Sequence, residues 1–197
     1  MDIPSIINNT KELLELRGEN AEEFQRKVDE VDVGRFADEW LTFSLKNYTL
    51  FFTLSKDSFK ELWGSIRNMS FEDMEKMYHT KKYVLILGEY PPSITLQALQ
   101  QKDIQFQQQS GFIQLFLSRE MMYNPNKHFL VPKHEKMSED EIKALMEELQ
   151  LKSKTQLPFI QKTDIISRWL GLKSGDLVKI TRYSETSGQY YYYRCCI

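Results

Sequence analysis

The chain has 197 residues, of which 41% are hydrophobic, 27% charged and 13% aromatic, and its formal net charge at pH 7 is −2. This composition is typical of a globular protein and excludes a disordered chain, a coiled coil and, for want of an apolar run near ~18 residues, a bilayer-spanning helix. The first residues lack the basic start and apolar core of a secretory signal.

Charge is unevenly distributed along the chain. Residues 1–125 carry 14 Lys and Arg against 19 Asp and Glu, whereas residues 126–197 carry 12 against 9. Neither half is basic enough to hold nucleic acid by itself, because non-specific affinity grows with the number of phosphates neutralised. Any contact with DNA or RNA is therefore expected to be local or shared with other chains.

The first 125 residues predict alternating helices and strands without repeats. Caps, apolar periodicity and β-favouring runs place the elements, and the pair Pro91-Pro92 forces a turn after the clearest strand. In chain order we expect a helix at 3–16 that stops at Gly18, a strand at 48–54, a helix capped by Asp57 or Ser58, a helix begun by Ser70, a strand at 81–90, a helix at 94–102, a short strand at 104–108, a helix at 112–117 and a last strand at 121–123.

The turn-forming sequence Asn124-Pro125-Asn126 predicts a domain boundary, so that a second, smaller domain covers 126–197. The predicted fold is α+β: a mixed α/β domain at 1–125 followed by a small α+β domain with a β-hairpin. In the second domain we expect a helix opened by the capping box of Ser138 and Glu141, an extended segment at 156–160, a short helix from Asp164 to Gly171, and strands at 177–183 and 189–196 joined by S-E-T-S-G.

The last predicted strand holds four consecutive tyrosines, Tyr190 to Tyr193, and ends in the chain's two cysteines. Alternation puts Tyr190, Tyr192, Arg194 and Cys196 on one face and the intervening residues on the other, so neither face is polar enough to be left in water. The predicted helices at 139–149 and 165–170 are candidates to cover the faces of this strand, and another polypeptide is a second candidate. The two possibilities are compatible. Tyrosine suits an interface because it buries a ring and keeps a hydroxyl.

Cys195 and Cys196 are adjacent, and neighbouring strand residues point to opposite faces, so a disulfide between them would be strained. We expect two reduced thiols, as in a nuclear or cytoplasmic protein. A zinc site built from these cysteines with His128 and His134 matches no usual ligand spacing.

Residues 128–194 resemble one family throughout: the fifth shared subunit of eukaryotic nuclear RNA polymerases, whose archaeal members have only the C-terminal part. The resemblance rests on motifs in a fixed order: H-x-L-V-P-x-H (128–134), Q-L-P-x-I (156–160), L-G-L-K-x-G (170–175), V-K-I-x-R (178–182), S-E-T-x-G (184–188) and Y-x-x-Y-R (190–194). The N-terminal half matches more weakly, and a chain with both halves resembles the eukaryotic and viral two-domain form. Departures at Ile165, Tyr183, Gln189 and the two cysteines indicate a divergent branch, such as that of a large DNA virus.

The resemblance implies a non-catalytic polymerase subunit without metal or cofactor. Its C-terminal domain would be an assembly module on the largest polymerase subunit, in contact with other subunits too, and its N-terminal domain part of a jaw near downstream DNA, met weakly and only within the complex. The implied location is the nucleus, or the cytoplasm or virion for a virus, with no membrane contact. The candidate interface residues are His128, Pro132, His134, Arg182, Ser184, Glu185, Thr186, Gly188, Tyr192 and Arg194; the candidate residues near nucleic acid are Pro91, Pro92 and Ser93.

The residues themselves leave alternatives. The fork of donors on Arg182 and Arg194 suits carboxylates or carbonyls across an interface, but the S-E-T-S-G residues equally serve to close the hairpin. A metal-dependent nuclease needs acidic residues on adjacent strands, which the clear strands here lack, while Glu75 lies on a predicted helix. A free-standing transcription adaptor with the same C-terminal fold remains open.

Overall fold

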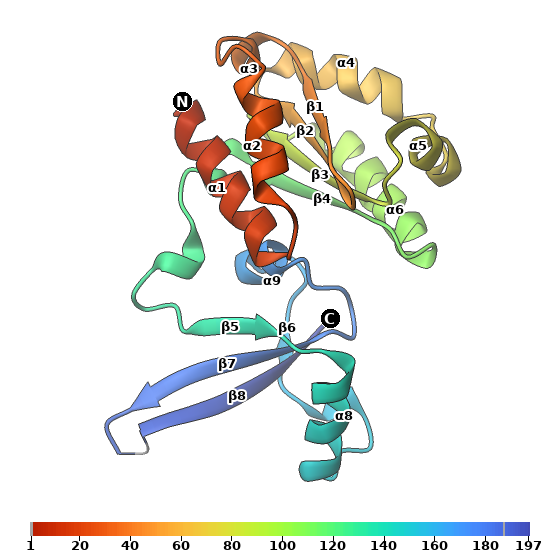
Figure 1. Ribbon diagram of the computed structural model, residues 1–197. Coiled ribbons are helices and arrows are strands. Elements are labelled where there is room, and N and C mark those ends of the chain that lie inside the picture. The colour runs from red at the N-terminus through yellow and green to blue at the C-terminus, as the bar shows by residue number, and fades with distance from the viewer. Residues whose placement is uncertain (1, 187) are drawn as a thin grey trace. The chain divides into compact units, whose positions relative to one another are not determined.

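A computed structural model describes residues 2–186 and 188–197, which form two compact units, Met1–Tyr123 and Asn124–Ile197 (Figure 1). Both units combine helices with a four-stranded sheet, so the fold is α+β as predicted. The division lies two residues before the boundary at 125/126 that the sequence suggests. Ser187, in the predicted S-E-T-S-G turn, lies outside the described residues.

The N-terminal unit is built on a mixed sheet with the strand order β1-β2-β3-β4. β1 and β2 are antiparallel, whereas β2, β3 and β4 run parallel and are joined by helical crossovers. The strands are β1 (Leu41–Ser44), β2 (Tyr48–Thr53), β3 (Lys82–Leu87) and β4 (Phe112–Leu117); the helices are α1 (Ile3–Leu16), α2 (Ala21–Asp29), α3 (Arg35–Asp38), α4 (Lys56–Ile66), α5 (Phe71–Tyr78), α6 (Ser93–Gln108) and α7 (Ser118–Met121).

Helices cover both faces of this sheet. On one face Phe51 and Tyr83 pack among residues of α4, α5 and α6, including Leu62 and Phe106. On the other face aromatic rings of α2 and α3 meet those of β1 and β2: Phe36 and Phe52 have ring centroids 5.2 Å apart. Because both faces are covered, β2 and β3 are buried along almost their whole length, which explains their continuous apolar sequences.

Two predicted elements after residue 110 have the wrong secondary structure. The segment 112–117 is not a helix but strand β4, and the strand expected at 121–123 is absent, because Met121 ends helix α7. FIQLFL has no two-residue alternation because β4 is buried on both faces apart from Leu115. Its one polar residue, Gln114, is buried where it accepts a hydrogen bond from Arg17, the C-cap residue of α1.

Two further predictions in the N-terminal unit are wrong: one takes part of a helix for a strand, and the other misplaces a helix N-cap. The helix at 94–102 and the strand at 104–108 form one helix, α6. Asp103, at the predicted break, instead accepts a hydrogen bond from the backbone N–H of Ile113 (2.9 Å) at the start of β4. The N-cap of α4 is Ser55 and not Asp57 or Ser58, because Ser55 and Ser58 form a reciprocal capping box. The predictions for α1, β2, α5 and β3 are confirmed.

The C-terminal unit contains a second sheet with the strand order β5-β7-β8-β6. Its capping predictions are confirmed: Ser138 and Glu141 form the box that opens α8, and Asp164 caps α9, which ends at Gly171 in the left-handed conformation. The elements are η1 (Pro125–Lys127), β5 (Lys133–Lys136), α8 (Glu139–Glu148), η2 (Lys154–Gln156), β6 (Phe159–Ile160), α9 (Ile165–Leu170), β7 (Leu177–Ser184) and β8 (Gly188–Cys196).

Strand β8 separates two small hydrophobic cores. On one face Cys196 packs with Ile166 and Leu170 of α9. On the other face Cys195 packs with Ile142 and Leu145 of α8. Both cysteines are free thiols. In the described parts of the chain, no helix has the length and apolar character that crossing a bilayer requires.

Candidate interaction surfaces

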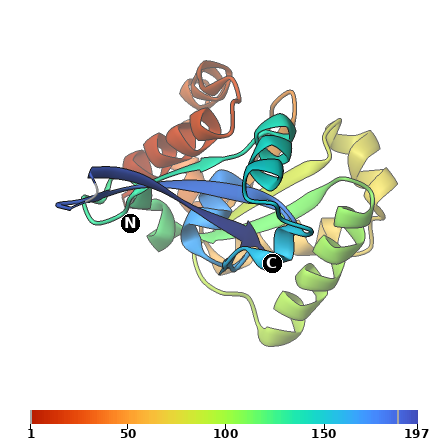
Figure 2. The same ribbon diagram turned by 90° about the horizontal axis from the view of Figure 1, so that it is seen from below.

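The hairpin of β7 and β8 extends beyond α8 and α9 in both views of the chain (Figures 1 and 2). Its strands pair from Leu177↔Cys195 at the base to Ser184↔Gly188 at the turn. Beside it, β5 reaches only as far as Lys133↔Thr181, and β6 pairs only with the two cysteines. The outer half of the hairpin therefore has no neighbouring strand among the described residues.

The tyrosines of β8 are more exposed to solvent near the turn of the hairpin than near its base. Tyr192 and Tyr193, nearer the base, are half-buried against the cores under α9 and α8. Tyr190 and Tyr191 are 38% and 48% exposed, and Tyr183 on β7 is 77% exposed. The unit's own helices thus cover the base of the hairpin, while its outer aromatic residues stay open to solvent.

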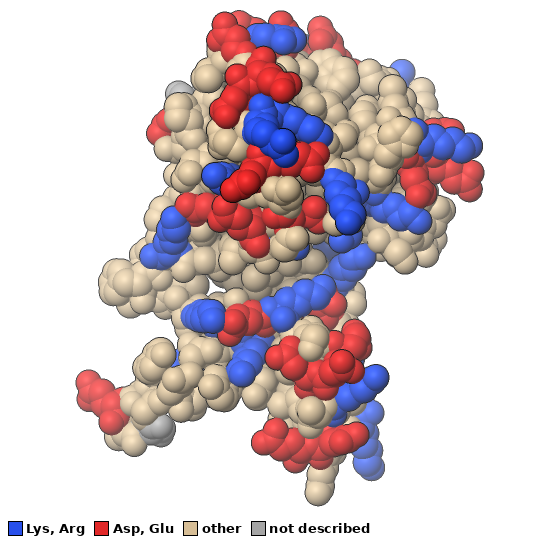
Figure 3. Space-filling view, in the orientation of Figure 1, with Lys and Arg blue, Asp and Glu red and all other residues tan. Residues whose placement is uncertain are grey.

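An open groove of about 610 Å³ lies between this hairpin and the segment that leads into β5. Phe129 and Leu130 on that segment are 87% and 71% exposed, although both are large and apolar. In Figure 3 the hairpin of the C-terminal unit is mostly tan, with acidic side-chain atoms at its tip. The groove is lined by Phe129, Leu130, Val131, Pro132, Lys133, Thr181, Arg182, Tyr183 and Tyr190. An exposed apolar surface of this kind is characteristic of an interaction site.

Cationic side chains are stacked on the tyrosine rings. The guanidinium carbons of Arg182 and Arg194 lie 5.2 Å and 5.5 Å from the centroid of the Tyr192 ring. On the opposite face, Lys179 Nζ lies 3.9 Å from the centroid of Tyr191. These contacts orient the rings and make both sides of the hairpin positive. An acidic or carbonyl-rich partner surface is the electrostatic complement.

The ring of His134 is hydrogen-bonded to the backbone of its own segment. In register it lies beside Ile180, the residue opposite Tyr192. Its Nδ1 lies 2.6 Å from the carbonyl oxygen of Pro132. Burial lowers the pKa of His134 below its usual value, with the Pro132 hydrogen bond opposing that shift. The ring is therefore neutral at pH 7, and its Nδ1–H donates to Pro132.

His128 is arranged differently. Its Nδ1 accepts a hydrogen bond from the backbone N–H of Leu130 (3.2 Å), and its ring stacks on Phe129. Across residues 2–186 and 188–197, no group of three His, Cys, Asp or Glu side chains is placed to hold a metal ion.

Apart from His128, the predicted interface residues fall into three groups. Pro132 and Arg182 line the groove, and His134, Tyr192 and Arg194 lie on the same sheet, where Arg194 Nη1 is 3.4 Å from the carbonyl oxygen of Phe159. At the turn Ser184 accepts from the backbone N–H of Thr186 (3.3 Å), Gly188 has φ +62°, and Glu185 is exposed. The turn residues thus close the hairpin.

Sequence reasoning missed the most exposed residues of the groove. Phe129, Leu130, Tyr183 and Tyr190 were not among the predicted interface residues, yet they supply its exposed apolar area. The available signal was the pair Phe129-Leu130: two large apolar residues in a segment without helical or strand periodicity, immediately before Val-Pro.

In the N-terminal unit the loop after β3 lies beside a cavity of about 400 Å³. The rings of Phe59, Trp63 and Tyr90 line it, together with Pro91 and Pro92. Of the residues predicted to lie near nucleic acid, Pro91 is buried, whereas Pro92 and Ser93 are exposed at the start of α6. Contact of this loop with DNA stays a prediction.

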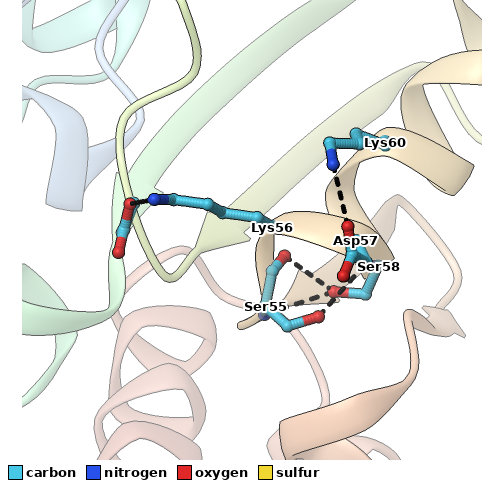
Figure 4. Close-up of polar contacts among 6 residues, drawn as sticks. Ser55, Lys56, Asp57, Ser58 and Lys60 are labelled. Atoms are coloured by element: carbon cyan, nitrogen blue, oxygen red, sulfur yellow. Dashed lines mark hydrogen bonds and ion pairs between the residues drawn. The ribbon is translucent and has the colours of Figure 1, made fainter.

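The lysines at the rim of this cavity have acidic partners. Lys60 Nζ lies 2.8 Å from Asp57, and Lys56 Nζ lies 3.0 Å from Glu89 (Figure 4). The capping box of Ser55 and Ser58 fixes the start of α4 between them. The rim is therefore close to neutral and offers no concentrated positive charge to a phosphate backbone.

Comparison with known proteins concerns the C-terminal part of the chain. Residues 123–196 match the family model described as RNA polymerase Rpb5, C-terminal domain. Two relatives, from Caenorhabditis briggsae and Caenorhabditis elegans, are named DNA-directed RNA polymerases I, II, and III subunit RPABC1, and each is 44% identical to this chain over 82 residues. The match covers 42% of this chain and 38% of each relative, so the chain spans well under half the length of the relatives in these comparisons. Residues 123–196, which carry the hairpin and its groove, are thus similar to the C-terminal domain of RNA polymerase Rpb5.

Proposed function

We propose that the chain is a non-catalytic subunit of a multisubunit DNA-directed RNA polymerase. Its C-terminal unit docks on the largest subunit of that polymerase, and its N-terminal unit lies near downstream DNA during transcription. The observation that carries the proposal is the exposed aromatic groove beside the hairpin, within a segment that matches the Rpb5 C-terminal domain.

The groove has the properties of a protein interface. It combines large exposed apolar side chains, Phe129 and Leu130, with Arg182 and with tyrosines that keep their hydroxyls. Interface hot spots are enriched in aromatic residues and arginine. Both named relatives are polymerase subunits, which makes a polymerase the expected partner.

The N-terminal unit is proposed to meet DNA only within the assembled enzyme. Its one predicted contact loop, at 91–93, carries no charge, and the neighbouring Lys56 and Lys60 are each paired with an acid. Fluorescence anisotropy of labelled duplex DNA with the isolated chain should therefore show no submicromolar, salt-sensitive binding. Such binding would contradict a contact shared with other subunits.

Copurification tests the docking proposal. The tagged chain, expressed in its natural host, should recover the two largest polymerase subunits. A double variant, Phe129→Ala with Leu130→Ala, should reduce that recovery on the order of tenfold, since it removes exposed anchors without touching a core.

Leu149→Ala is the matched control. Leu149 is also a partly exposed leucine of the C-terminal unit, but it lies at the end of α8 and does not line the groove. Recovery should equal that of the wild-type chain. If the wild-type chain recovers other transcription factors and no polymerase, it is a free-standing adaptor and the proposal is wrong.

A further inference from the structure

The outer edge of β8 has a defined hydrogen-bonding pattern. The N–H of Cys195 donates to the carbonyl oxygen of Pro158 (2.8 Å), and the N–H of Ile197 donates to the carbonyl oxygen of Ile160 (3.0 Å). Both N–H groups therefore point away from β7. The N–H of Cys196 donates to Asp176 (2.9 Å), toward β7. Backbone groups of successive strand residues point to opposite sides, so the pattern extends along β8.

Applied to the tyrosines, the alternation divides them into two pairs. Tyr190 and Tyr192 direct their N–H and C=O groups toward β7, where they face Arg182 and Ile180. Tyr191 and Tyr193 direct theirs to the outer edge. There β6 pairs only with the two cysteines, and Pro158, before β6, lacks an N–H with which to continue the ladder.

This edge lacks the usual protection against pairing. In many proteins a proline, an inward-pointing charge or a β-bulge prevents a free edge strand from pairing with another chain. From Gln189 to Tyr193 the strand has no proline and no charged residue, and its register with β7 is continuous. The edge is therefore suited to accept another extended backbone.

The positive charges beside the outer edge of β8 favour a partner with acidic side chains. Lys179, Arg182 and Arg194 flank the tyrosines on the two faces. A second copy of this chain paired edge to edge would bring these cations together, which is unfavourable. A segment of a different polypeptide with acidic side chains has the complementary charge.

We propose that the outer edge of β8, at Gln189–Tyr193, binds by strand addition to an extended, acidic segment of the subunit on which the chain docks. This rests on the proposed function and adds a mode of contact to it. The partner backbone pairs with Tyr191 and Tyr193 along the same edge of β8 that β6 occupies at the two cysteines. Side-chain packing in the groove alone would leave these two amides unpaired.

Proline and alanine substitutions separate backbone pairing from side-chain packing. Tyr191→Pro removes an outward N–H without removing a bond to β7, whereas Tyr191→Ala keeps the N–H and removes the ring. In copurification from the natural host, Tyr191→Pro should recover several-fold less of the largest polymerase subunit than Tyr191→Ala does. Circular dichroism and thermal melting of both variants establish that the chain is folded.

Amide hydrogen exchange gives a second measurement on the wild-type full chain. In the free chain, the amides of Tyr191 and Tyr193 should exchange fast and those of Tyr190 and Tyr192 slowly. In the complex with the copurified subunit, Tyr191 and Tyr193 should become protected.

The outcomes are distinct. Equal recovery with Tyr191→Pro and Tyr191→Ala, or unprotected Tyr191 and Tyr193 amides in the complex, refutes strand addition and leaves the proposed function standing. Absence of any polymerase subunit with the wild-type chain refutes both. A concentration-dependent dimer of the purified chain that Tyr191→Pro abolishes identifies a second copy as the occupant and overturns the proposal.

Discussion

Gly88, which follows β3 and begins the loop to Pro91 and Pro92, has no room for a methyl group. A Cβ at this position would lie 2.0 Å from the carbonyl oxygen of Leu54 and 2.8 Å from its carbonyl carbon. The obstruction is backbone, so no side-chain rotation can relieve it. The N–H of Gly88 also donates to Thr53 (3.0 Å), which fixes the distance between the ends of β2 and β3.

The size of the effect follows from these contacts. Overpacking a core costs about 1–3 kcal/mol when neighbours adjust, and a lost backbone hydrogen bond adds about 1 kcal/mol. We therefore expect Gly88→Ala to lower the free energy of unfolding by about 2–4 kcal/mol. Gly64→Ala provides the control: a Cβ there meets nothing within 4 Å, and Gly64 lies inside α4. Alanine should stabilise that helix by about 1 kcal/mol.

Urea unfolding of the full chain, followed by far-ultraviolet circular dichroism, measures both changes. With a slope of about 2 kcal/mol per molar urea, the midpoint of the transition that reports the N-terminal unit should fall by about 1–2 M for Gly88→Ala. For Gly64→Ala it should rise by about 0.5 M. A Gly88→Ala midpoint equal to that of the wild type would refute the reasoning, as would a destabilised Gly64→Ala chain.

Three further predictions concern the C-terminal unit. Burial lowers the pKa of His134, so the unfolded chain binds a proton at this histidine more readily than the folded chain, and the free energy of unfolding should fall as the pH drops below about 6.5. In melting curves recorded from about pH 5 to 8, His134→Asn should make the melting temperature less dependent on pH, and the same pH dependence as in the wild type would contradict this. Burial raises the pKa of both Cys195 and Cys196, the latter to about 11, so a thiol reagent at pH 8 should label neither until the unit unfolds; rapid labelling of the native chain would show the cores to be open. Ser138→Ala removes the N-cap of α8 and should cost about 1 kcal/mol in urea unfolding, with Ser138→Asp, which keeps a capping oxygen, restoring most of the loss.

Local signals in the sequence predicted those elements whose ends are fixed by local hydrogen bonds. Ser70, Ser138 and Asp164 all cap the helices assigned to them, because an N-cap acts on residues two or three positions away. The hairpin strands were found for the same reason: their turn residues are adjacent in sequence.

Elements that depend on distant contacts were predicted less well. Strand β4 is apolar because helices cover both of its faces, and nothing within six residues distinguishes such a strand from a buried helix. The helix was expected to end before Asp103, which instead lies within α6 and accepts a hydrogen bond from the N–H of Ile113 on the next strand. Of the groove, Pro132 and Arg182 were predicted from motifs, whereas the exposure of Phe129 and Leu130 is visible only in three dimensions.

The position of β8 between two separate cores restricts how this strand can evolve. Gain or loss of one residue between Tyr192 and Cys195 would rotate the following residues to the opposite faces. Arg194 would then point where a cysteine now packs, in a core that has no acid to neutralise it among the clustered residues. Exchange of one tyrosine for another aromatic residue keeps the spacing between the turn and the end of the strand, whereas an insertion or deletion changes it.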